Sequence, residues 1–211
     1  TNNKVVNIQT ITAHASGSSV DLTGQAEAFT INGAAGGDVL KGGSGNDIIT
    51  GSGGGDTLTG GAGTDTFNVD SGTDTVADLG GSGGGQSDIL VVSSGATANA
   101  TNIANFAATS ATKNSGIATL TGASGGSTIN MSNSSLGGYT LTGNAGVDNL
   151  TGSSNNDIIS GAGGNDIIVG GSGSDAITGG AADDSLTGSA GADTFNVDAG
   201  TDTVVDLGTG N

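Results

Sequence analysis

The stretch Gly42–Thr50 reads GGSGNDIIT, and its pattern returns every nine residues along much of the chain. In each repeat an aspartate follows a glycine-rich run, and a bulky apolar residue comes two positions later. A period this short and strict predicts a solenoid, in which each repeat stacks on its neighbours. The aspartates form two unbroken ladders, Asp38, Asp47, Asp56, Asp65 and Asp74, then Asp148, Asp157, Asp166, Asp175, Asp184, Asp193 and Asp202.

The two halves of a repeat predict different structures. Glycine in the first six residues permits the positive φ of a sharp turn that points oxygen atoms inward. The last three residues predict a short strand, in which Ile49 points into the core while Ile48 and Thr50 point outward, because side chains alternate along a strand. The predicted fold is therefore all-β.

The chain is also duplicated on a larger scale. Phe67–Gly80 reads FNVDSGTDTVADLG, and Phe195–Gly208 reads FNVDAGTDTVVDLG. Between the matching ends, the first ladder has five aspartates and the second has seven, so the second copy has gained two nonapeptides. This gain indicates that two repeats make one coil, because half a coil would place all later residues on the wrong side.

Each block begins with repeats that lack the aspartate, as expected of a solenoid end. Counting back in nines places Val20 and Phe29 at the aspartate positions before Asp38, and Tyr139 at the position before Asp148. At the block ends, four aspartates lie off the ladders, and they either add terminal ligands or solvate the last coil. These are Asp70, Asp78, Asp198 and Asp206.

A different segment separates the blocks. Asp88–Val92 predicts a buried strand, and Lys113–Gly116 predicts a hairpin turn between strands at 106–112 and 117–121. Ile103 and Phe106 could share a helix face, but the surrounding Thr and Ser favour a strand. Gly81–Gly85 is the best linker candidate. The expected organisation is a first module over 1–80 with its repeat block at about 20–79, a β-rich intermediate segment over 81–133, and a second block over 134–211.

The charge balance excludes several classes of partner. The formal net charge is −17 at pH 7, with three lysines and no arginine in 211 residues. Such a chain repels nucleic-acid backbones and anionic lipid surfaces. No stretch is apolar for long enough to span a membrane, so we expect neither nucleic-acid binding nor membrane insertion.

The ladders therefore need cations. Calcium takes about 6–8 oxygen ligands and tolerates irregular geometry, whereas magnesium demands a stricter arrangement. Zinc prefers Cys or His, and the chain has no cysteine and one histidine, His14. His14 has no catalytic companion, and the G-x-S-x-G motif is absent, so we expect no enzyme activity and no catalytic residue.

The pattern G-G-x-G-x-D-x-U-x, where U is bulky and apolar, is carried most closely by Gly42–Thr50 and by Gly170–Thr178 (GGSGSDAIT). It resembles the RTX (repeats-in-toxin) calcium-binding repeat, and the resemblance covers about half of the chain. The resemblance implies a parallel β-roll in which ions lie between the turns of successive coils, held by aspartates and turn carbonyls. Asn155 and Ala182 each replace a turn glycine, so their turns are expected to bind more weakly.

In this arrangement aspartates two repeats apart share an ion, which gives about eight calcium ions for the whole chain. The implied pairs are Asp38/Asp56, Asp47/Asp65, Asp56/Asp74, Asp148/Asp166, Asp157/Asp175, Asp166/Asp184, Asp175/Asp193 and Asp184/Asp202. The candidate turn carbonyls are those of Gly42, Ser44, Gly51, Gly53, Gly54, Gly61, Gly63, Gly72, Gly161, Gly163, Gly164, Gly170, Ser172, Gly173, Gly191 and Gly200.

Because the family includes secreted proteases, lipases, toxins, adhesins and surface-layer proteins, the repeat alone names no activity. The module duplication favours a secreted structural protein at a bacterial cell surface, which folds on calcium and assembles with copies of itself into a layer, fibre or adhesin array. Cell-surface polysaccharide is a further expected partner. The outward-pointing Ile167, Val169 and Ile158 are the candidate contact residues. One alternative is the C-terminal secretion and folding domain of a type I-secreted RTX enzyme or toxin, and another is a carbohydrate- or ice-binding adhesin module.

Overall fold

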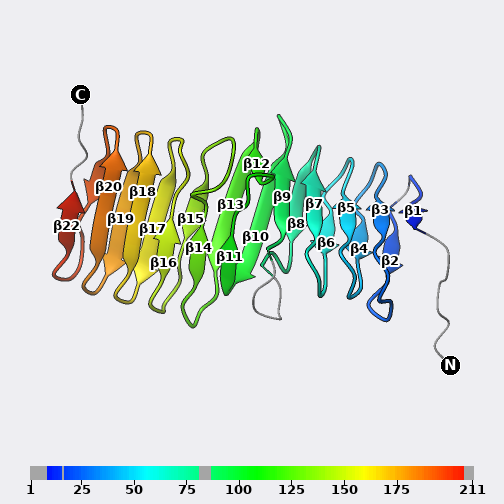
Figure 1. Ribbon diagram of the computed structural model, residues 1–211, viewed down its shortest axis with the longest axis horizontal. Coiled ribbons are helices and arrows are strands. Elements are labelled where there is room, and N and C mark those ends of the chain that lie inside the picture. Colours follow the sequence, from blue (N-terminus) through cyan, green and yellow to red (C-terminus); the bar gives the residue numbers. More distant parts are fainter. Residues whose placement is uncertain (1–8, 16, 81–86, 207–211) are drawn as a thin grey trace.

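A computed structural model of the chain describes residues 9–15, 17–80 and 87–206. These residues form 22 strands and no helix, so the predicted all-β class is confirmed. The strands stack along one long axis with β1 at one end and β22 at the other (Figure 1). Every pairing between strands is parallel, which confirms a parallel β-roll.

The strands belong to three sheets. The N-terminal sheet holds β1 (Thr10–Thr12), β3 (Thr30–Asn32), β5 (Ile48–Thr50), β7 (Thr66–Val69), β9 (Ile89–Val92) and β12 (Lys113–Asn114). The shared sheet holds β2 (Ser19–Asp21), β4 (Val39–Lys41), β6 (Thr57–Thr59), β8 (Thr73–Val76), β10 (Thr97–Ile103), β13 (Ile117–Gly122), β15 (Thr140–Thr142), β17 (Ile158–Gly163), β19 (Ala176–Ala181) and β21 (Thr194–Asn196). The C-terminal sheet holds β11 (Asn105–Ala107), β14 (Thr128–Asn130), β16 (Asn149–Thr151), β18 (Ile167–Ser172), β20 (Ser185–Ala190) and β22 (Thr203–Asp206).

Within each repeat block one coil consists of two strands and the two turns that precede them. Leu40 of β4 stacks on Leu58 of β6, and Leu58 stacks on Val76 of β8. All three side chains are buried, and the residues on either side of them point out of the roll. This register confirms that two nonapeptides make one coil and that the residue two positions after each aspartate fills the core.

The segment between the blocks continues the roll through wider coils. There the chain visits all three sheets in turn, through β9, β10 and β11 and then through β12, β13 and β14. Phe106 stacks on Ile129, and Met131 is fully buried nearby, because a wider coil needs large side chains to fill it. The shared sheet runs without interruption from β2 to β21, while its companion changes from the N-terminal to the C-terminal sheet.

Two predictions for this segment are confirmed and one is wrong. Asp88–Val92 contains the buried strand β9, and Ile103 and Phe106 lie on strands. The hairpin at Lys113–Gly116 is wrong, because β12 pairs with β9 in one sheet and β13 pairs with β10 in another. A corner between two walls of a solenoid uses the same polar and glycine residues as a hairpin turn. The linker candidate Gly81–Gly85 lies outside the described residues.

One prediction for the first coil is wrong. We use the word rung for an aspartate position of the repeat, whichever residue occupies it. Val20 does not occupy an aspartate position, because it stacks on Leu40 in the next coil, and Ser18 takes the rung instead. Counting in nines fails here because the chain adds two residues around the turn that Gln25 closes onto Leu22. Phe29 and Tyr139 do lie at aspartate positions, where their N–H groups donate to Asp47 and Asp157.

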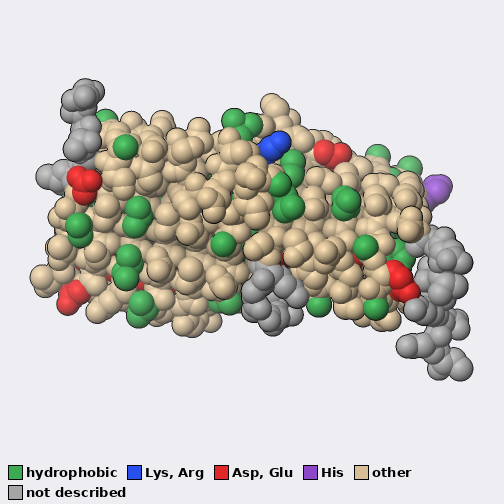
Figure 2. All heavy atoms as spheres, viewed as in Figure 1, with side chains coloured by type: hydrophobic (Ala, Val, Ile, Leu, Met, Phe, Trp, Pro, Cys, Tyr) green, Lys and Arg blue, Asp and Glu red, His purple; other side chains and the backbone are tan. Residues whose placement is uncertain are grey.

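On the face of the roll that Figure 2 shows, hydrophobic side chains are scattered and charged side chains are few. None of the described residues forms a helix that is long and apolar enough to cross a membrane.

Candidate metal centre

The ladder aspartates lie along the two edges of the roll, each directly before a strand except Asp74, which lies within β8. Asp38 and Asp56 precede β4 and β6 on the same edge as Asp74, and Asp47 and Asp65 precede β5 and β7 on the other. The structure therefore brings together aspartates two repeats apart and separates those of adjacent repeats. Ten of the twelve are buried, and Asp193 and Asp202 in the last coil are partly exposed.

One oxygen of each carboxylate joins successive coils. Asp56 Oδ1 accepts a hydrogen bond from the Asp38 N–H at 2.8 Å, and Asp166 Oδ1 accepts one from the Asp148 N–H at 2.8 Å. The same bond joins all eight of the predicted pairs. Oδ2 takes no part in this bond between coils.

Eleven of the twelve ladder Oδ2 atoms fall into two groups, and Asp65 belongs to neither. In the first two rungs of each block, which we call the leading aspartates, Oδ2 accepts the N–H of the residue four positions earlier. These bonds run from Ala34 to Asp38 (2.8 Å), Gly43 to Asp47 (2.8 Å), Asn144 to Asp148 (2.9 Å) and Ser153 to Asp157 (2.7 Å). In seven later rungs, the following aspartates, Oδ2 is buried without a hydrogen-bond partner. These are Asp56, Asp74, Asp166, Asp175, Asp184, Asp193 and Asp202.

Turn geometry explains most of this difference. In five of the seven following turns, the residue four positions before the aspartate has positive φ, so its N–H is turned away from the carboxylate. The residues are Ser52 (68°), Ala162 (76°), Gly171 (111°), Gly180 (116°) and Ser189 (74°). The equivalent residues of the leading turns have ordinary φ. Non-glycine residues pay a steric cost in this conformation, so packing of the coil must hold it in place.

Glycine at the start of each turn leaves room for the carboxylate. A Cβ on Gly161 would stand 2.1 Å from Asp166 Oδ2 and 2.5 Å from the Gly179 carbonyl oxygen. A Cβ on Gly51 would stand 2.6 Å from Asp56 Oδ2 and 2.7 Å from Asp74 Oδ2. Carboxylates from successive coils therefore converge on the same small space, together with turn carbonyls.

The predicted turn carbonyls differ in their surroundings. The carbonyl oxygens of Gly51, Gly161 and Gly170 each face the first turn glycine of the preceding coil, where the Oδ2 atom of an aspartate also lies. The equivalent carbonyls of Gly60, Gly179 and Gly188 were not predicted, although the position of these glycines at the start of each turn indicates the same role. Three predicted carbonyls already accept backbone hydrogen bonds, namely those of Gly53 (from Gly36), Gly54 (from Thr73) and Gly72 (from Thr97).

Burial makes these carboxylates costly to ionise. Burial, followed by the charges of neighbouring aspartates, raises the pKa of Asp65 to about 7. Burial likewise raises the pKa values of Asp74, Asp166 and Asp175 to about 6. A buried carboxylate without a donor must take up a proton or a cation.

The oxygen donors fit a calcium ion. Across the described ranges, no three acidic, histidine or cysteine side chains gather around one point. An ion between two coils would therefore take up to two carboxylates and complete its coordination with turn carbonyls. Calcium accepts such a mixed, irregular set of oxygens, whereas zinc does not.

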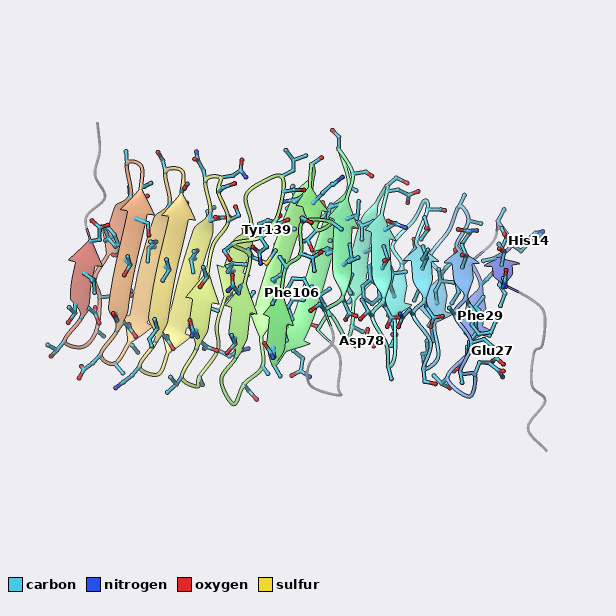
Figure 3. The ribbon with its side chains drawn as sticks, viewed as in Figure 1. His14, Glu27, Phe29, Asp78, Phe106 and Tyr139 are labelled. Carbon is cyan, nitrogen blue, oxygen red and sulfur yellow. The ribbon has the colours of Figure 1, made fainter. Side chains whose placement is uncertain are left out.

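The structure also adds a rung that the nine-residue count missed. Asp88 lies one coil after Asp65, and its Oδ1 accepts the Asp65 N–H at 2.9 Å while its Oδ2 accepts the Gly80 N–H at 2.8 Å. In the sequence Leu90 follows Asp88 by two positions, as the apolar residue does in every repeat, but the longer coil shifts Asp88 off the nine-residue spacing. Asp78, at the edge of the roll (Figure 3), accepts the N–H groups of Gly60 and Gly61.

Other predicted site residues lie apart from the ladders. Ile167, which is 50% exposed, and Val169 lie on β18 in the C-terminal sheet. Ile158, 59% exposed, lies on β17 in the shared sheet, so it does not share a wall with the other two. His14 is exposed near the N-terminal end (Figure 3).

Comparison with known proteins agrees with this geometry. The model of the RTX calcium-binding nonapeptide repeat (4 copies) matches residues 30–58, 42–76, 142–177 and 169–204. No curated protein matched the chain. The four matches span 30–76 and 142–204, more than half of the 211 residues, and they contain both aspartate ladders. The chain therefore belongs to the RTX calcium-binding nonapeptide repeat family, whose repeats bind Ca²⁺.

Proposed function

We propose that this protein is an extracellular structural module that folds when calcium fills its ladders and then serves as a rigid element of a bacterial surface layer, fibre or adhesin. The observation that carries the proposal is the row of seven buried carboxylate oxygens without hydrogen-bond partners. Such a row is unfavourable unless cations neutralise it.

Each ion would be held by the Oδ2 atom of the second aspartate of a pair and by the glycine carbonyls around it, and the first aspartate would add its own Oδ2 only where that atom has no hydrogen-bond partner. Seven of the eight pairs end in a following aspartate whose Oδ2 has no partner, and the eighth ends in Asp65, whose pKa is the most strongly raised. One ion for each pair gives about eight ions, in line with the oxygen demand of calcium. The ion supplies positive charge, while the chain fixes Oδ1 through the preceding coil and keeps space open with glycine.

Calcium would also supply folding free energy. Ordering each residue costs about 1–2 kcal/mol, and each coil of the repeat blocks buries only two bulky apolar side chains. Metal binding that requires the folded state contributes directly to its stability. Because extracellular calcium modules bind in the range of roughly 0.1–1 mM, the chain would stay unfolded in a low-calcium cytosol and fold after export.

The test is far-ultraviolet circular dichroism of the full chain in chelator and in millimolar calcium. We expect a disordered spectrum in chelator and a β-rich spectrum in calcium, with magnesium at the same concentration as the matched control. A β-rich spectrum that chelator leaves unchanged would contradict the proposal.

A second candidate function, binding of ice or a flat polysaccharide, is favoured by the outer face of the shared sheet. In the shared sheet from β6 to β21, the outward-pointing residues on either side of each inward-pointing residue carry no charge. Four of these strands present paired threonines, at Thr57/Thr59, Thr73/Thr75, Thr119/Thr121 and Thr140/Thr142. Thermal hysteresis and polysaccharide pull-down of the calcium-loaded chain distinguish this function from a purely structural one.

A further inference from the structure

One sequence occurs twice in the roll, once covered and once at its end. In the first module Phe67 and Val69 of β7 and Val76 of β8 are fully buried. Their counterparts in the second copy are Phe195, Val197 and Val204, and Val197 is 53% exposed whereas Val69 is 0% exposed. The same residues that are fully buried in mid-roll are thus only partly covered at the C-terminal end, where Phe195 and Val204 are partly buried and Val197 is exposed.

The covering in the first module comes from the next coil. Leu90 of β9 stacks on Phe67, and Val92 stacks on Val69, in parallel register. In the neighbouring sheet Ala100 of β10 covers Val76. Among the described residues, no strand follows β21 in the shared sheet or β22 in the C-terminal sheet (Figure 1). The last coil therefore presents the apolar surface that, in mid-roll, receives another coil.

The hydrogen-bonding groups at the two ends are complementary. Along the roll the carbonyl of each rung accepts an N–H from the next coil, as Asp175 accepts from Thr194 and Asp184 from Thr203. The register therefore points the carbonyls of Asp193 and Asp202 off the C-terminal end. By the same register, the N–H groups of Thr10 and Ser19 point off the N-terminal end, where no described strand precedes β1 or β2. Acceptors at one end thus match donors at the other.

The side chains at the N-terminal end suit this contact. Ile11, Ala13 and Val20 are partly exposed and occupy the inward positions of β1, the residue after it and β2. The rungs of this coil are Gln9 and Ser18, because Gln9 accepts from Thr30 and Ser18 accepts from Val39 through their backbone carbonyls. Neither rung is charged, so no carboxylate would face Asp193 and Asp202 across the contact. In mid-roll the uncharged Ala98 occupies the equivalent position in the coil that covers Asp74.

From these ends we infer that the C-terminal coil docks a second copy of this chain, whose β1 and β2 pair with β21 and β22 and continue the roll head to tail. The inference rests on the proposed function, since it requires the calcium-folded coil at both ends. Open edges of parallel strands are templates for such pairing. The two contacting surfaces differ, and docking continues the roll along its own axis, so copies add without closing a ring and form filaments with the roll axis along their length.

The test blocks one end of the chain. In Thr10→Pro with Ser19→Pro, proline removes the two N–H groups that point off the N-terminal end and places its ring against an approaching strand. The matched control is Thr10→Val with Ser19→Val, which keeps both N–H groups. In millimolar calcium we expect the parent and the valine variant to form concentration-dependent filaments in sedimentation velocity and electron microscopy. The proline variant should stay monomeric, and when added to the parent it should shorten the filaments.

A second variant approaches the contact from the other end and serves if proline disturbs folding. Val197→Lys places a charge on a side chain that docking would bury, and it should also abolish filaments. Circular dichroism distinguishes a failure of the proposed function from a failure of the docking. A chain that stays unfolded in calcium overturns both. A parent that folds but stays monomeric overturns the docking alone. The docking is also overturned if both end variants still assemble. Lateral assembly that only Ile167→Asp with Val169→Asp prevents would be such a result.

Discussion

The division between leading and following aspartates predicts opposite consequences for the same substitution. Asp166 is 1% exposed, and its Oδ2 has no partner. Its pKa of about 6, against an ordinary value of 3.8, means that the ionised carboxylate destabilises the metal-free fold by about 3 kcal/mol at neutral pH. Asp166→Asn removes this cost together with one charged ligand.

In calcium the balance reverses. An ion at a concentration 100 times its dissociation constant stabilises the fold by about 2.7 kcal/mol, and Asp166→Asn should lose about that much together with one bound ion. Asp148→Asn is the control, since Ser127 Oγ–H and the Asn144 N–H both donate to the Asp148 carboxylate. An amide group there faces a donor and costs about 1–3 kcal/mol with or without calcium, and the number of ions bound should stay the same.

Isothermal titration calorimetry gives the number of ions, and denaturant unfolding at fixed calcium gives the stability. The expected result is a lower ion count for Asp166→Asn only, and a calcium-independent loss of stability for Asp148→Asn only. Equal effects of both substitutions on ion count would refute the distinction between leading and following rungs.

Because burial raises the pKa values of ladder aspartates, to about 7 in the most perturbed case, protonation should stabilise the metal-free fold, so β structure in chelator should increase as pH falls from 7.5 to 5; a spectrum independent of pH would contradict this. Ala182 has φ 88° at a turn-glycine position, so Ala182→Gly should raise the unfolding free energy in calcium by about 1 kcal/mol, whereas Ala181→Gly should not. Gly161→Ala should abolish the ion at Asp166, because the added Cβ would stand 2.1 Å from its Oδ2, whereas Gly24→Ala, with nothing within 4 Å, should bind calcium like the parent.

Much of the roll was predictable because its repeat is local. The nine-residue spacing of Asp56 and Leu58 with their neighbours determines strand, turn and inward face together, so the core and the two-repeat coil are as expected. The pairing of aspartates two repeats apart followed from the two nonapeptides that the second copy has gained and from the resemblance to the RTX repeat. Where the period breaks, counting fails, as it did for Val20 in the longer first coil and for Asp88 after the wider coil that follows Asp65.

Other features depend on interactions that no single repeat encodes. The wide middle coils arise because the two blocks use different companion sheets, and this change shows only in the pairing of β12 with β9 and of β11 with β14. The difference between leading and following rungs depends on φ at positions such as Ser52 and Ala162, where the residue type alone argues against a positive value. Stacking on the preceding coil, rather than local propensity, selects that conformation.

The most direct test of the calcium account is a crystal structure of the calcium-loaded chain with an anomalous difference map. If calcium fills the ladders, peaks are expected between successive coils beside the Oδ2 atoms of the following aspartates, from Asp56 to Asp202, each close to turn carbonyls. Calcium-loaded crystals in which these oxygens contact no ion, or in which ions lie only at the exposed aspartates outside the ladders, would contradict it.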